Sequence, residues 1–236
     1  RPKMPWKAIF TSKPAWAAFV AHIGTTTTYL LLLAQIPTYL HYILDVNIKS
    51  SGVLTSLPYL ANSVASIIFG QLCDYCTNNE ILSLKQARVI SNNVATVIPA
   101  ICLASLSFTS NTVLGVAFLV LALAAYAGAH TGWMLNYIDL APNFSGALMA
   151  IGNTLMNITA LVLPVFVSRV VADVRDPYQW RIVMFSVAAF GVFCNTVYIC
   201  FMSTDLQLWN DAEYHAAAQE EEASGISKKS EDLSKK

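Results

Sequence analysis

The most constraining feature of this sequence is a long region in which charged residues are almost absent. No Asp, Glu, Lys or Arg occurs between Arg88 and Asp139, and none occurs between Asp139 and Arg169. Apolar runs of this length are long enough for helices that cross a bilayer, which need roughly 20 residues each. A carboxylate is costly at the centre of a bilayer, so Asp139 is expected to mark a turn at the membrane surface, as Pro142 and Gly146 also indicate. The region around Asp139 is therefore predicted to be a membrane helical hairpin.

The same pattern over the rest of the chain predicts six membrane-spanning helices. Of the 236 residues, 56% are hydrophobic and only 12% are charged, whereas soluble domains average about a quarter charged residues. The expected fold is an all-α bundle that follows an interfacial lead-in at 1–14 and precedes a disordered tail at 204–236. The predicted spans are 15–39, 53–72, 89–108, 113–136, 145–168 and 182–202.

Basic residues predict the orientation of this bundle. Six spans place both termini on one side of the membrane, and cytoplasmic loops carry an excess of Lys and Arg. The terminal side, with a loop expected at 74–88, has six basic residues near the spans, and the other side has four. The termini are therefore predicted to be cytoplasmic. The six are Arg1, Lys3, Lys7, Lys13, Lys85 and Arg88, and the four are Lys49, Arg169, Arg175 and Arg181.

Motifs for catalysis, metal binding or nucleic-acid binding are lacking. Cys73 and Cys76 form a CxxC, but no second CxxC and no nearby His completes a zinc site, so the pair is interpreted as incidental. The sequence shows no catalytic triad, phosphate-binding glycine loop or facing pair of carboxylates. Its formal net charge of +0 provides no overall basic field for nucleic acid. We therefore expect neither an enzyme nor a cofactor or metal site, and no nucleic-acid partner.

Polar side chains within the predicted spans are the candidates for a binding site. His22 and His130 lie inside spans, where a histidine can relay protons or donate to a substrate, or can simply bond a neighbouring helix. Amides can bind anionic oxygens or join helices, and Asn157 is interpreted as a joining residue. The predicted cavity residues are His22, Thr25, Tyr29, His130, Asn136 and Asn153.

Four stretches resemble one transporter family. They are residues 5–12 (PWKAIFTS), 57–61 (LPYLA), Asn136 with 139–142 (DLAP) and Gly146, and residues 153–154 (NT) with Pro164. Together they resemble the carboxy-terminal half of a major facilitator superfamily transporter. The similarity is greatest to the anion/phosphate cotransporter family, which includes sialin, the vesicular glutamate transporters and the sodium-phosphate cotransporters.

The resemblance implies a twelve-helix fold in which this chain supplies six helices and an amino-terminal half supplies the others. It implies alternating-access transport of phosphate or an organic anion, coupled to sodium or protons, in a plasma, vesicle or lysosomal membrane. Gly70 and Asp74 resemble a conformational loop motif. The chain departs from the family at Thr25, near the place of a substrate-binding arginine in some members, and at Tyr137, where many members have histidine.

Two alternatives remain open from the sequence. A self-contained six-helix channel or membrane scaffold would show the same hydrophobic pattern without a second half. A membrane-embedded enzyme would require a clustered nucleophile or metal-binding set at one depth. The chain begins at Arg1 with its first Met at position 4 and no recognisable signal peptide, so it is interpreted as a piece of a longer protein.

Overall fold

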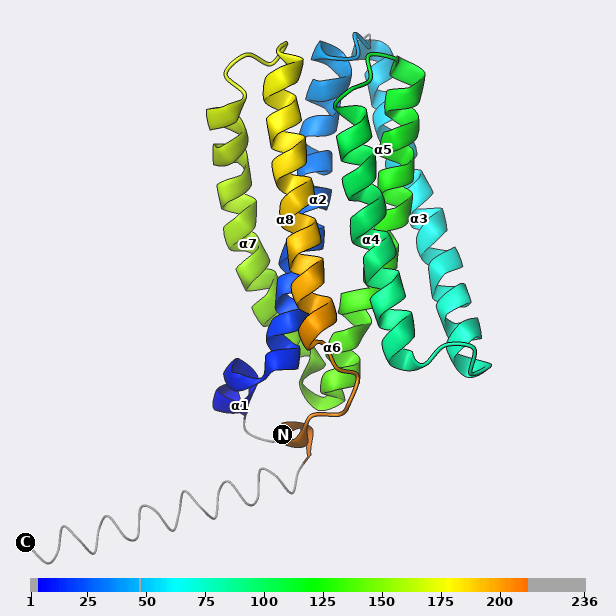
Figure 1. Cartoon of the computed structure of the whole chain (residues 1–236), viewed down its shortest axis with the longest axis vertical. Coiled ribbons are helices and arrows are strands. Elements are labelled where there is room, and N and C mark those ends of the chain that lie inside the picture. Colours follow the sequence, from blue (N-terminus) through cyan, green and yellow to red (C-terminus); the bar gives the residue numbers. More distant parts are fainter. Residues whose placement is uncertain (1–3, 47, 212–236) are drawn as a thin grey trace, which may run out of the picture.

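The computed structural model describes residues 4–46 and 48–211, and the regular elements in these ranges are all helices. The long helices lie side by side as an upright bundle (Figure 1). Five helical segments of the described residues are long and apolar enough to cross a membrane, by length and composition. The elements are α1 (Trp6–Thr11), α2 (Lys13–Tyr42), α3 (Ile48–Asn78), α4 (Leu84–Leu106), α5 (Thr112–Tyr126), the π-helical η1 (His130–Met134), α6 (Leu135–Leu140), η2 (Pro142–Phe144), α7 (Ser145–Val170), α8 (Pro177–Phe201) and η3 (Leu208–Asn210).

The order of packing differs from the order along the chain. Helix α2 packs against both α7 and α8, α8 packs against α4, α4 against α5, and α5 against α3. Helices α3 and α7 therefore lie at opposite edges of the bundle (Figure 1). The outer face of α7 exposes large apolar side chains, as expected of a helix in lipid or against another apolar partner. These side chains are Ile158, Leu161, Val162 and Val165.

Side-chain caps set the points at which several long helices begin. The Ser12 hydroxyl accepts a hydrogen bond from the Ala15 backbone N–H at the start of α2. Ser83 and Gln86 form a reciprocal capping box at the start of α4, and Asn111 caps α5. These contacts satisfy N–H groups that have no partner within the first turn of a helix.

The predicted span at 113–136 is an interrupted helix in the structure. Helix α5 ends at Tyr126, a π-helical turn follows, and α6 continues to Leu140. Gly132 has φ −87° and ψ −111°, outside the helical range. A Cβ at Gly128 would lie 2.5 Å from the Ser91 carbonyl oxygen, so glycine permits close contact with α4 here. The break therefore lies in a segment of small residues against α4.

Two expected connections differ from the structure. Residues 74–88 were expected to be a loop, but α3 continues to Asn78 and α4 begins at Leu84, leaving a short turn in which Glu80 has φ 57°. Asp139 was expected to lie in a turn, but it lies in α6, and η2 makes the turn that follows. Gly146 belongs to α7 rather than to the turn. The Ser83–Gln86 capping box accounts for the early start of α4. An ion pair of Asp139, described below, accounts for its place in a helix.

The disorder predicted from residue 204 is wrong for residues 204–211. The Gln207 N–H donates to the Leu140 carbonyl oxygen (2.9 Å). Asn143 donates from its backbone N–H and its side chain to Asn210 (3.0 Å each), and Trp209 is only 5% exposed. This segment therefore packs onto the end of the bundle. Residues 1–3 of the predicted lead-in and 212–236 of the predicted tail lie outside the described residues.

Candidate functional site

The candidate site lies where α2 faces the interrupted helix. His22 and Tyr29 are seven residues apart on α2, so they share a helix face and are separated by about 10 Å along its axis. His22 contacts residues of η1 and α6, whereas Tyr29 contacts residues of α5 and α3. The face of α2 thus brings together side chains from four elements.

His22 is enclosed between two aromatic residues. It is 3% exposed, and its ring stacks on that of Trp133 with centroids 3.8 Å apart and an interplanar angle of 15°. Its Nδ1 lies 3.3 Å from the Tyr137 hydroxyl. A Cβ at Gly152 would lie 2.5 Å from that hydroxyl and 2.6 Å from Nδ1, so glycine allows α7 to cover this pair. The arrangement fixes the imidazole in one orientation, with a hydroxyl as its polar partner.

A second group of side chains surrounds Tyr29. Its ring stacks on Tyr126 at a centroid distance of 4.9 Å, and Tyr59 meets it edge-on at 6.5 Å. His130 lies edge-on to Tyr126, and its Nδ1 is 3.1 Å from the Ser66 hydroxyl. The Tyr59 hydroxyl is buried and has no hydrogen-bond partner in the described part of the chain. We call the following residues the polar seam: His22, Tyr29, Tyr59, Ser66, Tyr126 and His130.

Three other predicted cavity residues lie differently. Thr25 is buried and donates to the Ala21 carbonyl oxygen of its own helix (2.8 Å). Asn136 is fully buried, and its side-chain amide donates to the Ser203 carbonyl oxygen (2.8 Å), which joins α6 to the segment after α8. Asn153 is exposed on α7. The structure therefore brings His22, Tyr29 and His130 into one seam. Thr25 lies on the same face of α2 between His22 and Tyr29, with its hydroxyl bonded to its own helix, whereas Asn136 and Asn153 lie outside the seam.

The residues of the predicted conformational loop lie near the end of α3. Asp74 is exposed, and a Cβ at Gly70 would meet no atom within 4 Å. Neighbouring Cys73 and Cys76 are free thiols. Among the described residues, no three His, Cys, Asp or Glu side chains are grouped so that they could hold a metal ion.

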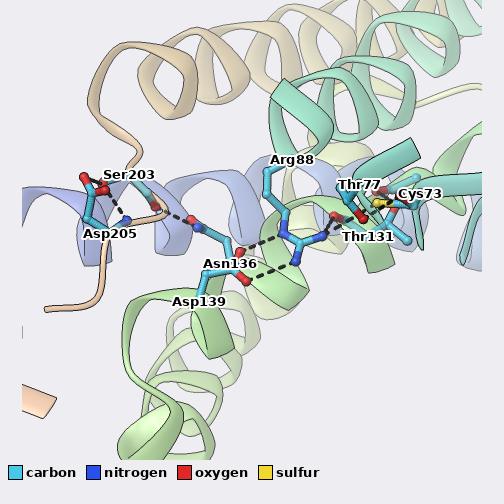
Figure 2. Close-up of polar contacts among 9 residues, drawn as sticks. Cys73, Thr77, Arg88, Thr131, Asn136, Asp139, Ser203 and Asp205 are labelled. Atoms are coloured by element: carbon cyan, nitrogen blue, oxygen red, sulfur yellow. Dashed lines mark hydrogen bonds and ion pairs between the residues drawn. The ribbon is translucent and has the colours of Figure 1, made fainter. Parts of the chain in front are cut away.

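A buried ion pair joins the elements at this end of the bundle. Arg88 binds both carboxylate oxygens of Asp139, with Nε–Oδ2 at 2.7 Å and the second contact at 3.0 Å. Its remaining nitrogen donates to the Thr131 carbonyl oxygen (3.1 Å) and lies 3.8 Å from the Cys73 sulfur. Figure 2 shows the guanidinium between these groups, with Asn136 beside it. The side chains of Arg88 and Asp139 are 8% and 10% exposed, so water screens their charges little.

Comparison with known proteins decides the family. The sequence profile of the Major Facilitator Superfamily matches residues 1–164. The chain belongs to the major facilitator superfamily. This membership and the helices of the described residues confirm the predicted all-α membrane fold, and the chain is a multi-pass membrane protein.

Relatives of this major facilitator chain include proteins named as a phosphate cotransporter and a glutamate transporter, not as enzymes. It is 33% identical over 213 residues to "Putative inorganic phosphate cotransporter" of Drosophila ananassae, covering 89% of this chain and 44% of the relative. It is 32% identical to human "Sialin", covering 90% and 43%, and 30% identical to human "Vesicular glutamate transporter 2", covering 89% and 36%. The predicted resemblance to this group is confirmed. The chain spans less than half the length of each of these relatives.

The sequence predictions for this major facilitator chain missed several residues of the site. The most important is the Arg88–Asp139 pair, because Arg88 was interpreted as a basic loop residue and Asp139 as part of a surface turn and of the DLAP stretch, and no contact between them was predicted. Two crossings separate them, α4 and the α5–α6 segment, so they had to lie at the same surface, and this was the available signal. Tyr59 and Tyr126 gave no comparable signal, because tyrosine in a span is equally typical of helix packing.

Proposed function

We propose that this chain is the carboxy-terminal six-helix half of a secondary transporter that moves inorganic phosphate or an organic anion by alternating access. Coupling to sodium or protons is part of the proposal. The amino-terminal six-helix half of the same protein would be its partner. The relatives' names and the chain's coverage of less than half of their length support this assignment.

The observation that carries the proposal is the polar seam beside an interrupted helix. Transporters bind substrates and ions near the bilayer midplane, typically at discontinuous helices whose backbone groups are free to bind. Here the non-helical Gly132 lies in the same π-helical turn as His130 and Trp133. His130 belongs to the seam, and Trp133 stacks on His22 of the seam. Polar side chains and irregular backbone at this depth are costly in lipid and are typical of a functional site.

The chemistry of the seam suggests which substrate contacts each half of the transporter would supply. The contacts of Tyr29, Tyr126 and His130 among the described residues are with neutral groups. Hydroxyl and imidazole N–H groups can donate to phosphate or carboxylate oxygens. Compensation of the substrate's negative charge would then fall to the amino-terminal half or to the coupling ion.

Exposed amides on α7 support the presence of a second half. Asn153 and Asn157 lie four residues apart, on one face of the helix, and both are exposed. Moving an amide from water into hydrocarbon without a hydrogen-bond partner costs on the order of several kcal/mol. We infer that this face meets protein or an aqueous cavity in the complete transporter, with Asn153 at the cavity.

The ion pair and the adjacent loop are candidates for the conformational part of the cycle. Arg88 connects α4, η1, α6 and α3, and the proposed loop residues Gly70 and Asp74 lie on the α3 segment that carries its Cys73 contact. Rearrangement at this end would accompany alternating access. The transporter would lie in a plasma, vesicle or lysosomal membrane with its termini cytoplasmic.

Uptake by the full-length protein tests the function. Purified protein in liposomes would be supplied with labelled phosphate or organic anions under imposed sodium or pH gradients. We expect gradient-dependent uptake that Tyr59→Phe and His130→Phe reduce at least tenfold, because each variant removes a polar group of the seam. Tyr178→Phe is the matched control, since Tyr178 is 64% exposed outside the seam.

Two results would contradict the proposal. One is the absence of uptake of any tested anion by protein shown to be folded in the bilayer. The other is unchanged uptake in both seam variants. Function of the isolated chain as an anion-independent pore would instead favour the self-contained channel.

A further inference from the structure

An apolar groove runs along the outside of the bundle between α2 and α8. Figure 1 shows these helices adjacent at the end where α1 joins α2. The groove has a volume of about 300 Å³. Its lining residues from the α1–α2 side are Thr11, Lys13, Trp16, Ala17 and Val20, and those from α8 are Val197 and Phe201.

Aromatic side chains show the depth of this groove in the membrane. Trp6, Phe10 and Trp16 form a continuous series of ring contacts and are 53%, 48% and 40% exposed. The Trp16 indole N–H donates to the Phe10 carbonyl oxygen (2.9 Å), which ties α1 to α2. Tryptophan concentrates at the level of lipid headgroups. The groove therefore begins at headgroup depth and continues toward the hydrocarbon.

The polarity of the groove changes with that depth. Thr11 and Lys13 lie at its mouth, at the junction of α1 and α2. Ala17 and Val20 lie about one and two turns further along α2, and Val197 lies one turn inside the end of α8. The polar groups are thus confined to the headgroup end, while the wall along the helices is apolar.

Helix stability does not account for the cation at the mouth. Lys13 is the first residue of α2, where the helix dipole disfavours a positive charge. The one salt bridge among the described residues is Arg88–Asp139, so no described carboxylate pairs with Lys13. Its ammonium is exposed and available to an anion in the headgroup layer.

We propose that this groove binds one anionic phospholipid, with an acyl chain along Ala17, Val20 and Val197 and the phosphate at the Lys13 ammonium. The combination of a cation at headgroup depth with an apolar wall matches a lipid in both charge and polarity. A water-soluble anion would gain nothing from the apolar wall. The proposal does not depend on the transported substrate.

Native mass spectrometry of the full-length protein tests the headgroup contact. Protein in detergent would be titrated with phosphatidylglycerol or phosphatidylcholine, and bound lipid would be counted. We expect tighter retention of phosphatidylglycerol and about fivefold weaker binding in Lys13→Gln, the value for one basic residue near an anionic surface. Lys85→Gln is the matched control, since Lys85 is exposed in the first turn of α4 at the same end of the bundle.

A second pair of variants tests the acyl wall. Val20→Phe would fill the groove and reduce retention of both lipids, whereas Val192→Phe, on α8 outside the groove and 38% exposed, would not. Equal loss in Lys13→Gln and Lys85→Gln would overturn the proposal. So would equal retention of the two lipids, unchanged retention in Val20→Phe, or displacement of the lipid by millimolar inorganic phosphate. These readouts do not involve transport, so the lipid proposal can fail while the proposed function holds.

Discussion

At the scale of single residues, the Arg88–Asp139 pair offers the sharpest test of stability. Removing one partner leaves the other charge buried without compensation, which typically costs about 3–5 kcal/mol. We expect Arg88→Met and Asp139→Leu each to lower the unfolding temperature of the purified full-length protein markedly. The double variant should be more stable than either single variant, because it leaves no unpaired charge. Additive losses in the double variant would show that the two side chains do not act as a pair.

The histidines and the asparagine of the predicted cavity show what the sequence could and could not predict about the site. Histidines in apolar runs stand out because ionisable groups are rare in the membrane, so His22 and His130 were recognisable candidates. Their partners Trp133, Tyr137 and Ser66 were not, since rings and hydroxyls are ordinary in spans. Asn136 was predicted to line the cavity, but its amide bonds the Ser203 carbonyl oxygen. Such a contact depends on the path of the chain after α8, which hydrophobic patterning does not specify.

At the scale of helices, the packing of α7 onto α2 and α6 depends on Gly152. A Cβ there would lie 2.5 Å from the Tyr137 hydroxyl and 2.6 Å from His22 Nδ1. Gly152→Ala must therefore displace α7 or these rings. We expect a loss of about 1–3 kcal/mol, typical of overpacking. Gly146→Ala on the same helix meets no atom within 4 Å and should be neutral or slightly stabilising. Unfolding temperatures of the two variants measure the difference, and equal values would contradict this packing.

The approximate positions of the long helices follow from apolar length, but helix interruptions do not. The charge-free run between Arg88 and Asp139 predicts two crossings, and the structure has α4 and the α5–α6 segment there. The π-helical turn at His130–Met134 arises from close packing against α4 at Gly128 and Gly132, where Ser91 and Asn92 approach the backbone. Small residues in a span predict close packing of this kind. They do not predict which partner approaches, and the partner decides where the helix breaks.

At the scale of the whole molecule, the proposed orientation can be tested with two cysteine variants. The turn after α3 and the α7–α8 connection lie at opposite ends of the bundle (Figure 1). Asn79→Cys and Val174→Cys place one thiol at each end, both at exposed positions. Replacing Cys76 and Cys200 by serine, in the full-length protein, limits background labelling by the less buried native thiols.

Because basic residues favour the cytoplasmic side, we expect Asn79→Cys to be the cytoplasmic thiol. In cells whose plasma membrane is selectively permeabilised, an impermeant maleimide should label Asn79→Cys in either a surface or a vesicle membrane. For protein in vesicles, Val174→Cys should react only after detergent is added. For protein at the cell surface, Val174→Cys should react in intact cells, and Asn79→Cys should not. The reverse pattern would place the termini, Lys13 and the lipid groove at the opposite leaflet. Labelling of both thiols from one side would contradict an odd number of crossings between them, and with it the six-helix arrangement.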